Sequence, residues 1–363
     1  MENVFALKLK ELREKHRYSL QDLADQVGVA KQSIHKFENG QVNPSSETIL
    51  KIADALNVSY SFFFENSANT NFSLANIRFR EEHKIFKDDK DGMENEIKQE
   101  VFRYLSRFME LETIMDVDRE FDNPLSGIEI ISDKDIEKAA KILRKKWKIG
   151  NAPISDVVET LENKGVFVIE VNRLENFAGL SGTVNDDIPI IVLNENCLTV
   201  ERKRFTALHE LGHIVLEFPD HISEDKAEFF CDYFAGAVLL VDDVLYDELG
   251  KNRTVISLAE LRRIKEVYGI SIQAIIMRAR TSGFIDYNTS RNWWKAYDDW
   301  KSDETSSNDF GNFRCNEKTT RFKNLLVRGV TEKRISISKA AELTGRKVDV
   351  IRKELDELNF NVR

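Results

Sequence analysis

Hydrophobic residues recur at helical spacing along most of this chain, while β-branched runs gather in one short region. The runs 166–171 and 188–194, with the glycine-containing stretch 179–184 between them, predict a strand followed by a β-hairpin. Two strongly apolar helical stretches follow at 205–216 and 226–240. Strands and then packed helices in this order predict an α+β core.

Helical periodicity predicts further helices on both sides of this core. They cover residues 94–115, 133–147, 154–161, 258–268, 271–280 and 319–328. The helix at 94–115 has one apolar side, which is compatible with bracing the next domain or with dimerisation. That side consists of Ile97, Val101, Tyr104, Leu105, Phe108 and Leu111. Polar residues at 66–71 predict a linker, and charged residues at 87–92 predict a loop.

The helical stretch 205–216 contains two histidines four residues apart, His209 and His213, with Glu210 beside the first. Four residues correspond to about 400° of rotation in a helix, so both imidazoles leave the same face. Two neutral ring nitrogens placed in this way can hold one zinc ion. The adjacent carboxylate can then act on a metal-bound water, which predicts a catalytic site with Glu210 as its general base.

A catalytic zinc ion needs a third protein ligand, and the stretch 226–240 offers candidates. Glu228 and Asp232 lie four residues apart on an otherwise apolar helix, where carboxylates are costly unless a cation meets them. We expect Glu228 to bind the metal and Asp232 to accept the second N–H of a ligand histidine. The alternative is that Glu228 lies at the solvent edge and pairs with Lys226 or a neighbour. Cys231 is either a soft ligand or a small buried hydrophobe.

These residues resemble the ImmA/IrrE family of zinc metallopeptidases. The resemblance rests on His209-Glu210-Leu211-Gly212-His213 and on the pattern Glu228-x-x-Cys231-Asp232-x-Phe234-Ala235 with Leu239-Leu240. It implies a zincin-like fold in which His209, His213 and Glu228 bind zinc, Glu210 is the base and Asp232 supports a ligand. Three departures put substrate preference in question. They are Cys231 in place of alanine, Val241-Asp242 in place of Met-Pro, and Glu217 where many members carry a histidine.

The expected reaction is hydrolysis of a peptide bond. Zinc lowers the pKa of its bound water toward neutrality, so Glu210 can take a proton as hydroxide attacks the carbonyl. A further donor to the oxyanion is expected, and His221 is one candidate. A strand edge beside the cleft would let an extended substrate add main-chain hydrogen bonds. The alternative role for the small sheet is shielding of the core.

The first sixty residues predict a second, independent module. Ser19 is expected to cap a helix with Asp22 as its reciprocal partner, and Gly28 to adopt a positive φ in the turn that follows. Residues 30–38 predict a short second helix with a polar face. This order of elements is the helix-turn-helix arrangement. The alternative is a helical protein-interaction module.

The spacing of this module resembles the Xre/Cro-type repressors over about residues 6–62. The resemblance implies that Gln21 contacts a phosphate and that Gln32 reads an adenine edge in the major groove. The residues implied to face that groove are Lys31, Gln32, Ser33 and Lys36. Charges of both signs in this module imply that tight binding to a double-stranded DNA operator needs two copies, as in a homodimer.

The last part of the chain is helical and leans basic. Residues 337–345 with 348–355 resemble another helix-turn-helix. Such a segment is compatible with gripping DNA, with binding a partner protein, or with capping the peptidase. An aromatic cluster precedes it, formed by Trp293, Trp294, Tyr297 and Trp300.

Composition indicates the partners and the cellular compartment to expect for this protein. The 363 residues carry a net charge of −9, which argues against nonspecific coating of nucleic acid but allows one DNA-reading module. Three cysteines, Cys197, Cys231 and Cys315, form no paired framework and fit a reducing cytosol. We find no membrane-spanning stretch and no signal peptide, so we expect a cytoplasmic protein without a membrane partner.

Together these patterns predict a multidomain, mainly α protein with an all-α N-terminal domain and an α+β, zincin-like peptidase core. The expected domains are a helix-turn-helix domain at 1–65, a linker and bracing helix at 66–130, the peptidase at 131–285 and a helical domain at 286–363. We expect a DNA-binding transcriptional regulator that is also a zinc metallo-endopeptidase. Its expected substrate is a partner protein, such as a repressor, encoded by a neighbouring gene. The alternative is an antitoxin or autoregulating repressor of a toxin–antitoxin or phage module, with the peptidase fold used for partner contact.

Overall fold

The computed structural model describes residues 4–56, 58, 63, 77–79, 93–172, 178–185, 188–195, 199–302 and 310–359. The chain divides into two compact units. The first comprises residues 1–71, 103–118 and 322–363, and the second comprises residues 72–102 and 119–321. The predicted linker at 66–71, the predicted loop at 87–92 and Cys197 lie outside the described residues. The domain boundaries expected at residues 65, 130 and 285 stay predictions.

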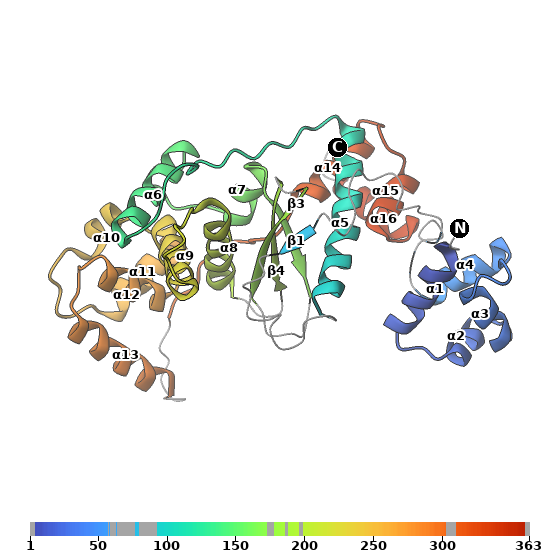
Figure 1. Ribbon diagram of the computed structural model, residues 1–363, viewed down its shortest axis with the longest axis horizontal. Helices are drawn as coiled ribbons and strands as arrows, with labels where there is room; N and C mark the ends of the chain where they lie inside the picture. The colour runs from blue at the N-terminus through green and yellow to red at the C-terminus, as the bar shows by residue number, and fades with distance from the viewer. Residues whose placement is uncertain are drawn as a thin grey trace. The chain divides into compact units, whose positions relative to one another are not determined.

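The N-terminal part of the first unit is a bundle of four helices (Figure 1). They are α1 (Val4–Lys15), α2 (Leu20–Val27), α3 (Lys31–Glu38) and α4 (Ser46–Ala55). The predicted cap is present, because Ser19 Oγ accepts from the Asp22 N–H at 3.1 Å and Asp22 Oδ2 accepts from the Ser19 N–H at 2.7 Å. Gly28 ends α2 with φ +75°, a conformation that glycine adopts without strain. The helix-turn-helix arrangement of α2 and α3 is therefore confirmed.

The same unit contains α14 (Arg321–Thr331), α15 (Ile337–Thr344) and α16 (Val348–Asn359). The helix-turn-helix-like arrangement predicted for this stretch is present in α15 and α16. Ser336 caps α15, Gly345 ends it with φ +67°, and α16 begins three residues later. The same spacing occurs in α2 and α3. The glycine follows the serine cap by nine residues in both motifs, and Lys31 likewise begins α3 three residues after Gly28.

Helix α5 (Met93–Met115) passes from the second unit into the first. Five of the six residues predicted to form its apolar side are buried, and Tyr104 is half-buried. The part of α5 in the first unit packs against α14, since the Phe108 and Phe322 rings meet edge-to-face with centroids 5.3 Å apart.

A small mixed sheet organises the second unit (Figure 1). Its strands are β1 (Ile77–Phe79), β2 (Phe167–Val171), β3 (Gly179–Val184) and β4 (Ile188–Asn194), in the order β1-β3-β4-β2. The predicted hairpin is confirmed, because β3 and β4 pair antiparallel with Val184 opposite Ile188. The parallel pairing of β2 with β4 and the addition of β1 to β3 were not predicted.

Strand β1 pairs with the second half of β3. The pairs run from Ile77 opposite Val184 to Phe79 opposite Gly182. On its other side, β3 pairs with β4 from Gly179 opposite Leu193 to Val184 opposite Ile188.

The described part of the second unit also contains eight helices, of which α7 and α8 contact the sheet. They are α6 (Asp133–Lys146), α7 (Val157–Asn163), α8 (Val200–Val215), α9 (Glu224–Leu239), α10 (Asp242–Leu249), α11 (Leu258–Tyr268), α12 (Ile272–Thr281) and α13 (Tyr287–Ser302). Helix α7 begins three residues later than predicted because Asp156 caps it, with Oδ1 accepting from the Glu159 N–H at 2.8 Å. None of the helices that the structure describes has the length and apolarity needed to cross a membrane.

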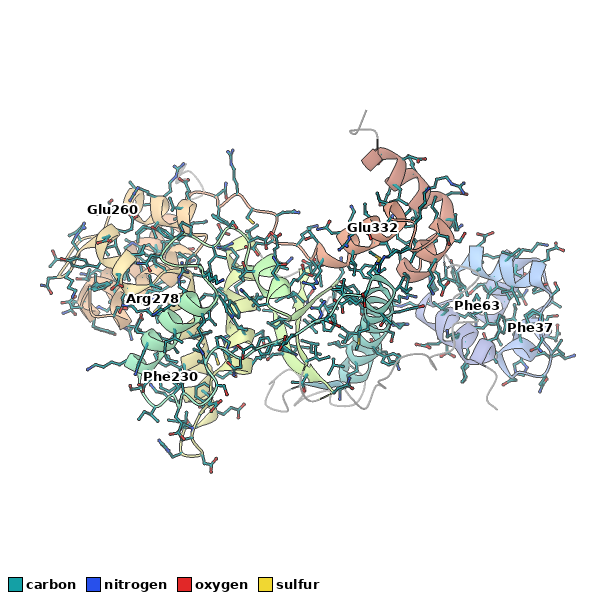
Figure 2. The ribbon with its side chains drawn as sticks, turned by 90° about the horizontal axis from the view of Figure 1, so that it is seen from above. Phe37, Phe63, Phe230, Glu260, Arg278 and Glu332 are labelled. Atoms are coloured by element: carbon teal, nitrogen blue, oxygen red, sulfur yellow. The ribbon has the colours of Figure 1, made fainter. Side chains whose placement is uncertain are left out.

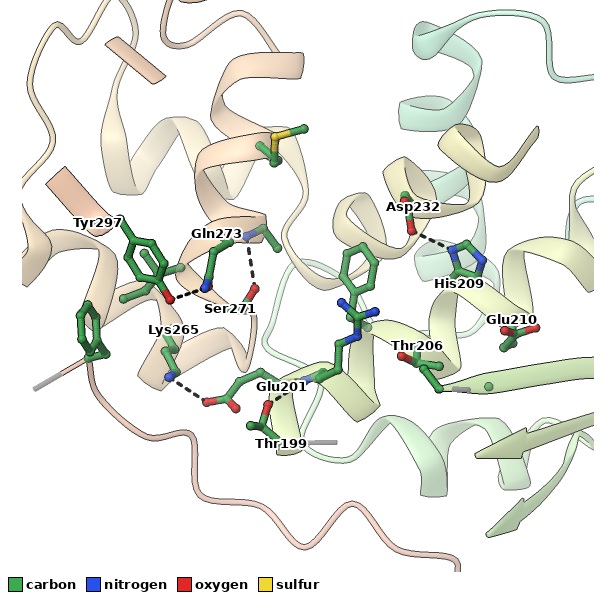
Figure 3. A pocket seen from close by; sticks show the side chains of 18 residues that line it. Thr199, Glu201, Thr206, His209, Glu210, Asp232, Lys265, Ser271, Gln273 and Tyr297 are labelled. Carbon is green, nitrogen blue, oxygen red and sulfur yellow. Dashed lines mark hydrogen bonds and ion pairs between the residues drawn. The ribbon is translucent and has the colours of Figure 1, made fainter. Parts of the chain in front are cut away.

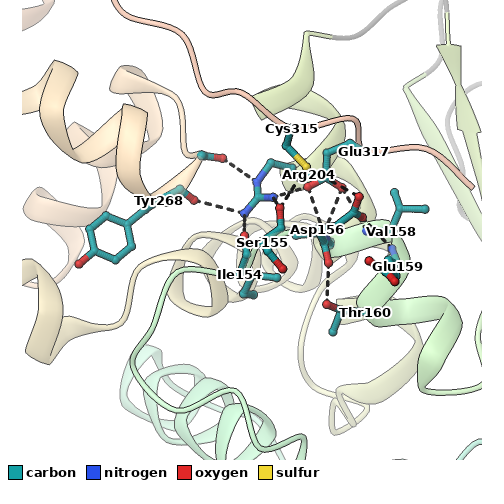
Figure 4. A network of polar contacts seen from close by, with 12 residues as sticks. Ile154, Ser155, Asp156, Val158, Glu159, Thr160, Arg204, Tyr268, Cys315 and Glu317 are labelled. Carbon is teal, nitrogen blue, oxygen red and sulfur yellow. Dashed lines mark hydrogen bonds and ion pairs between the residues drawn. The ribbon is translucent and has the colours of Figure 1, made fainter. Parts of the chain in front are cut away.

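A buried ion pair links α8 to several neighbouring segments of the chain (Figure 4). Arg204 is fully buried, pairs with Glu317, and donates to the carbonyl oxygens of Ile154 at 2.7 Å and Gly269 at 3.0 Å. Glu317 also accepts the N–H groups of Val157 and Val158 at 3.0–3.1 Å. A buried pair with its remaining donors and acceptors satisfied holds these elements in one arrangement, and losing one partner would be costly.

A second buried arginine supports the end of α9. Arg278 (Figure 2) lies in α12, pairs with Glu137 and Asp242, and donates to the Leu240 carbonyl at 3.0 Å. Gly236 makes room for it, because a Cβ there would lie 2.8 Å from Arg278 Cδ. Helix α9 is therefore held firmly at the end away from Glu228.

Candidate metal centre

Helices α8 and α9 pack side by side and carry the residues predicted to bind a metal (Figure 1). Thr199 caps α8 and Ser223 caps α9, each through a side-chain oxygen that accepts a backbone N–H three residues on. The helices approach closely at Gly212, where a Cβ would lie 3.2 Å from Cys231 Sγ. This close approach sets the histidines of α8 beside the carboxylates of α9.

The side chains of His209, His213 and Glu228 converge on one point. The two Nε2 atoms are 3.1 Å apart, and the carboxylate oxygens of Glu228 lie 3.3 Å from His209 Nε2 and 3.2 Å from His213 Nε2. Among the described residues, no other set of three histidine, cysteine or acidic side chains brings its ligand atoms within 4.8 Å of one another. Two imidazoles and one carboxylate are a donor set that fits a divalent metal ion.

The alternative ion pair between Glu228 and Lys226 is not observed. Lys226 instead lies with its Nζ 3.5 Å from Asp133 Oδ1 and over the rings of Phe229 and Phe230. The Glu228 side chain is about one-third exposed (36%), so one face of the converging group is open to solvent. A water or a substrate needs such an open face to reach a metal ion bound at these side chains.

The outer nitrogens of both imidazoles also have neighbours on α9. Asp232 Oδ1 lies 2.8 Å from His209 Nδ1, and Cys231 Sγ lies 3.2 Å from His213 Nδ1. Each outer N–H can donate to its neighbour, which leaves the Nε2 lone pairs turned toward Glu228. The structure thus brings Asp232 to the place predicted for it, whereas Cys231 stands behind a histidine and outside the converging group.

The charges around this point favour a cation. Burial lowers the pKa of His209, but hydrogen bonds with Asp232 and Glu228 raise it more strongly, to about 10. Hydrogen bonds with His209 and His213 in turn hold the pKa of Glu228 well below its usual range. A proton on the imidazole satisfies these carboxylates, and so would a metal ion bound at the same nitrogens.

Glu210 lies beside this group as a buried carboxylate with an unused oxygen. Its side chain is 4% exposed, and Oε2 has no hydrogen-bond partner among the described residues. Leaving such an atom unpaired costs free energy unless a water or a substrate group reaches it. The start of β3 lies against it, because a Cβ at Gly179 would be 3.1 Å from Glu210 Cγ and 2.6 Å from the Thr206 methyl group. Only glycine lets the strand pass so near the predicted base.

A cleft of about 720 Å³ opens next to His209 and Glu210 (Figure 3). Its lining comes from α8, α9, the start of β3, α11, α12 and α13. At the end away from Glu210, Gln273 donates to the Tyr297 hydroxyl, and Lys265 pairs with Glu201 at 3.2 Å. The sequence did not predict this wall of the cleft. Polar residues on α12 and α13 have the same spacing whether they line a cleft or face the solvent.

Two other candidates lie apart from the converging group. Glu217 accepts the N–H of Gly127 at 3.0 Å and so supports the loop before α6. His221 is exposed in the turn before α9. Neither belongs to the group formed by α8 and α9, and the role of His221 as an oxyanion donor stays a prediction.

The residues implied to contact DNA lie on α2 and α3. Gln21, Lys31, Gln32 and Lys36 are exposed, and Ser33 is half-buried. The Gln21 amide donates to Asp25 Oδ1 at 2.7 Å. The face of α3 opposite these side chains is buried through Ile34 and Phe37. The polar side chains are thus available on one exposed surface.

Comparison with known proteins gives a family for each part. A helix-turn-helix family model matches residues 9–63, and a peptidase family model described as an IrrE N-terminal-like domain matches residues 162–280. The second match contains α8, α9 and the three strands β2, β3 and β4.

The chain is also similar to curated proteins that are described as HTH-type transcriptional regulators. An HTH-type transcriptional regulatory protein of Pyrococcus abyssi is 28% identical over 175 residues, which are 46% of this chain and 48% of that protein. The chain thus spans about half the length of that relative. A prophage-derived HTH-type transcriptional regulator of Bacillus subtilis, YonR, is 32% identical over 74 residues, which are 20% of this chain and 68% of that protein. The Escherichia coli regulator SutR is 40% identical over 55 residues, or 15% of this chain and 31% of that protein.

Proposed function

We propose that this chain, which belongs to the helix-turn-helix transcriptional regulators and carries an IrrE N-terminal-like domain, is a DNA-binding regulator with zinc-dependent endopeptidase activity. The observation that carries the enzymatic part is the convergence of His209, His213 and Glu228 next to Glu210, whose Oε2 has no hydrogen-bond partner in the described part of the chain. Glu210 also lines the cleft next to His209, which supports a role toward a water or a substrate group held there.

The proposed ligands are His209, His213 and Glu228, and a zinc ion held there would supply an acidic bound water and polarise a peptide carbonyl. Glu210 takes a proton at Oε2 and later donates it to the leaving amine. Asp232 and Cys231 keep the two imidazoles turned so that both Nε2 atoms face Glu228. The open face at Glu228 admits the substrate.

The proposed regulatory part is the α2–α3 surface. Exposed Gln32 and Lys36 suit base and phosphate contacts in a major groove, with Gln21 at the backbone. We propose that the chain binds an operator as a dimer and that cleavage of a partner protein, such as a repressor, changes expression of the controlled genes.

Replacing Glu210 with glutamine tests the enzymatic part. The E210Q protein should retain the metal, because Glu210 is not one of the converging ligands, and should lose cleavage by a factor of roughly 10² or more. Cleavage is measured by mass spectrometry on a proteome-derived peptide library. Equal cleavage by E210Q and the parent protein would contradict the proposal. A full cellular phenotype with E210Q would instead favour the alternative role as an antitoxin or repressor that only binds its partner.

The proposed ligand set is tested by metal analysis of purified protein. Substituting His209→Ala or Glu228→Ala should lower the zinc bound per chain, because each removes one of three ligands. Asp243→Asn, at an exposed carboxylate in α10, is the matched control and should keep the parent's zinc content. Unchanged zinc in Glu228→Ala would remove Glu228 from the ligand set.

A further inference from the structure

We propose that Arg202 selects the substrate of this peptidase by binding an acidic side chain three residues away from the bond that is cut. The inference rests on the proposed peptidase function and deepens it by naming a class of substrate. It starts from the charges that line the cleft.

Three consecutive cations lie near the start of α8, and one of them lines the cleft. Lys203 is buried and pairs with Glu170. Arg204 is buried and pairs with Glu317. Arg202 is exposed and lines the cleft, and its guanidinium has no ion pair within the part of the chain that the structure describes.

Two further groups of the lining that can carry a positive charge already have partners. Lys265 pairs with Glu201 at 3.2 Å. His209 Nδ1 lies 2.8 Å from Asp232 Oδ1. Arg202 is therefore placed to meet a negative charge that a substrate brings into the cleft. A guanidinium suits a carboxylate, because two of its N–H groups can donate parallel hydrogen bonds to the two oxygens.

The position of Arg202 along α8 sets its distance from the reaction. Arg202 and His209 are seven residues apart, which corresponds to about 700° of rotation, so both side chains leave the same side of the helix. Seven residues rise about 10 Å along the helix axis. An extended peptide advances about 3.3 Å per residue, so a peptide whose cut bond lies at His209 and Glu210 brings its third residue beside Arg202.

The surface between these two points can accept such a peptide. Between Arg202 and His209, α8 contributes Phe205 and Thr206 to the lining of the cleft. Phe205 is half-buried and offers an apolar contact, and neither residue carries a charge that would repel an acidic peptide. The selecting charge on α8 thus lies apart from the reacting atoms, on the same side of the helix.

The first test compares the sequences that the zinc-loaded parent and its variants cut in a proteome-derived peptide library, read by mass spectrometry. Aspartate or glutamate should be enriched at the third residue from the cut, on the side that points toward the start of α8. Arg202→Ala should lose this enrichment, and Arg202→Glu should replace it with enrichment of lysine and arginine. The glutamate variant should fold, because an acidic residue three positions after the Thr199 cap is favourable in the first turn of a helix. Arg263→Ala, at an exposed arginine of α11, is the matched control and should keep the parent's profile.

Matched peptides measure the size of the effect. A peptide that the parent cuts is compared with a copy in which the acidic residue is replaced by its amide. The parent should cut the acidic peptide with a kcat/KM roughly fivefold higher, whereas Arg202→Ala should cut both peptides alike. Zinc-loaded E210Q should bind the acidic peptide more tightly by a similar factor in fluorescence anisotropy, which detects the contact without turnover. Amidating the C-terminus of the peptide should leave both ratios unchanged.

The outcomes separate this inference from the proposed function. If the parent cuts the library without this preference, or if Arg202→Ala retains it, the inference is overturned and the peptidase function stands. An equal loss of cleavage of all peptides in Arg202→Ala would assign Arg202 a structural role and would also overturn the inference. Loss of the preference on C-terminal amidation would show that a terminal carboxylate is bound, which contradicts the proposed side-chain contact. Failure of the zinc-loaded parent to cut any peptide would overturn the peptidase function together with the inference.

Discussion

Cys231 is buried, and its thiol lies 3.2 Å from Nδ1 of His213, on the side of the imidazole away from Glu228. The equivalent neighbour of His209 is the carboxylate of Asp232. The two histidines are therefore oriented by groups of different strength, because a thiolate or thiol accepts a hydrogen bond more weakly than a carboxylate does. At the scale of single residues, the orientation of His213 is the weaker of the two.

This difference predicts the effect of changing Cys231. Cys231→Ala should weaken zinc binding by roughly tenfold, because His213 loses the neighbour of its outer nitrogen. Cys231→Ser should stay near the parent value, because a hydroxyl oxygen can also accept that N–H. Zinc affinity is measured by competition with a chromophoric chelator, and the ¹⁵N shifts of the His213 ring report its tautomer in the metal-free protein. Cys315→Ala is the control, since Cys315 donates to the Ser155 carbonyl, away from the histidines. An alanine variant with parent affinity and an unchanged His213 tautomer would show that the contact has no orienting role.

Single residues also show how far the sequence can predict a site. The spacing of His209, His213 and Glu228 follows from helical geometry, so their shared face could be anticipated. The contact between Cys231 and His213, and the passage of Gly179 beside Glu210, depend on how closely two elements approach. Such distances are set by packing and have no signature in the spacing of one segment.

At the scale of elements, the end of α7 contains a buried carboxylate whose two oxygens differ. Glu162 Oε2 accepts the N–H groups of Thr320 and Arg321, both at 3.3 Å, while Oε1 has no hydrogen-bond partner among the described residues. Burial raises the pKa of Glu162 above its usual value. The fold therefore favours the protonated form of this carboxyl.

Glu162→Gln should consequently stabilise the protein at neutral pH. Below about pH 4.5 the carboxyl is protonated in both the folded and unfolded states, and as the pH rises the unfolded chain releases its proton first, so the parent loses stability. Glutamine keeps an acceptor for the two N–H groups and has no charge to bury. Thermal unfolding should show a gain on the order of 1 kcal/mol at pH 7.5 that shrinks toward pH 4.5. Glu162→Ala is the contrasting variant and should destabilise at both pH values, because it leaves two N–H groups unpaired. A glutamine variant less stable than the parent at pH 7.5 would contradict the assignment.

The strands and the helix α7 also show how far the fold can be predicted from the sequence. The β3–β4 hairpin could be predicted because two β-branched or glycine-rich runs lie on either side of a short polar turn. The parallel pairing of β2 with β4 joins strands that are not consecutive, and no local pattern specifies it. The start of α7 was placed three residues early because the apolar period begins before the Asp156 cap.

At the scale of the whole molecule, we expect mutations in the helix-turn-helix part and in the IrrE-like part to have independent effects. Gln32 and Lys36 are both exposed on α3, but one suits a base edge and the other a phosphate.

Gln32→Ala should reduce the preference for operator over random DNA, while Lys36→Ala should weaken binding to both sequences alike. The lysine variant should also lower the slope of log affinity against log salt by about one, the effect of losing one phosphate contact. Fluorescence anisotropy at several salt concentrations measures both quantities. Lys51→Ala, at an exposed lysine of α4 paired with Glu47, is the control and should change neither. Unchanged selectivity in Gln32→Ala would remove Gln32 from the reading surface.

The nine-residue interval from serine cap to left-handed glycine, followed by a helix three residues later, occurs twice in this chain. The two motifs share this interval but differ in part of the surface that they expose. The first motif presents Lys31, Gln32 and Lys36. The second presents Asp349 and Lys353 at the positions of Gln32 and Lys36, and Asp349 pairs with Arg352 at 3.6 Å. One arrangement of serine cap, left-handed glycine and following helix thus carries a glutamine in one copy and an ion-paired aspartate in the other, at the same place on the helix.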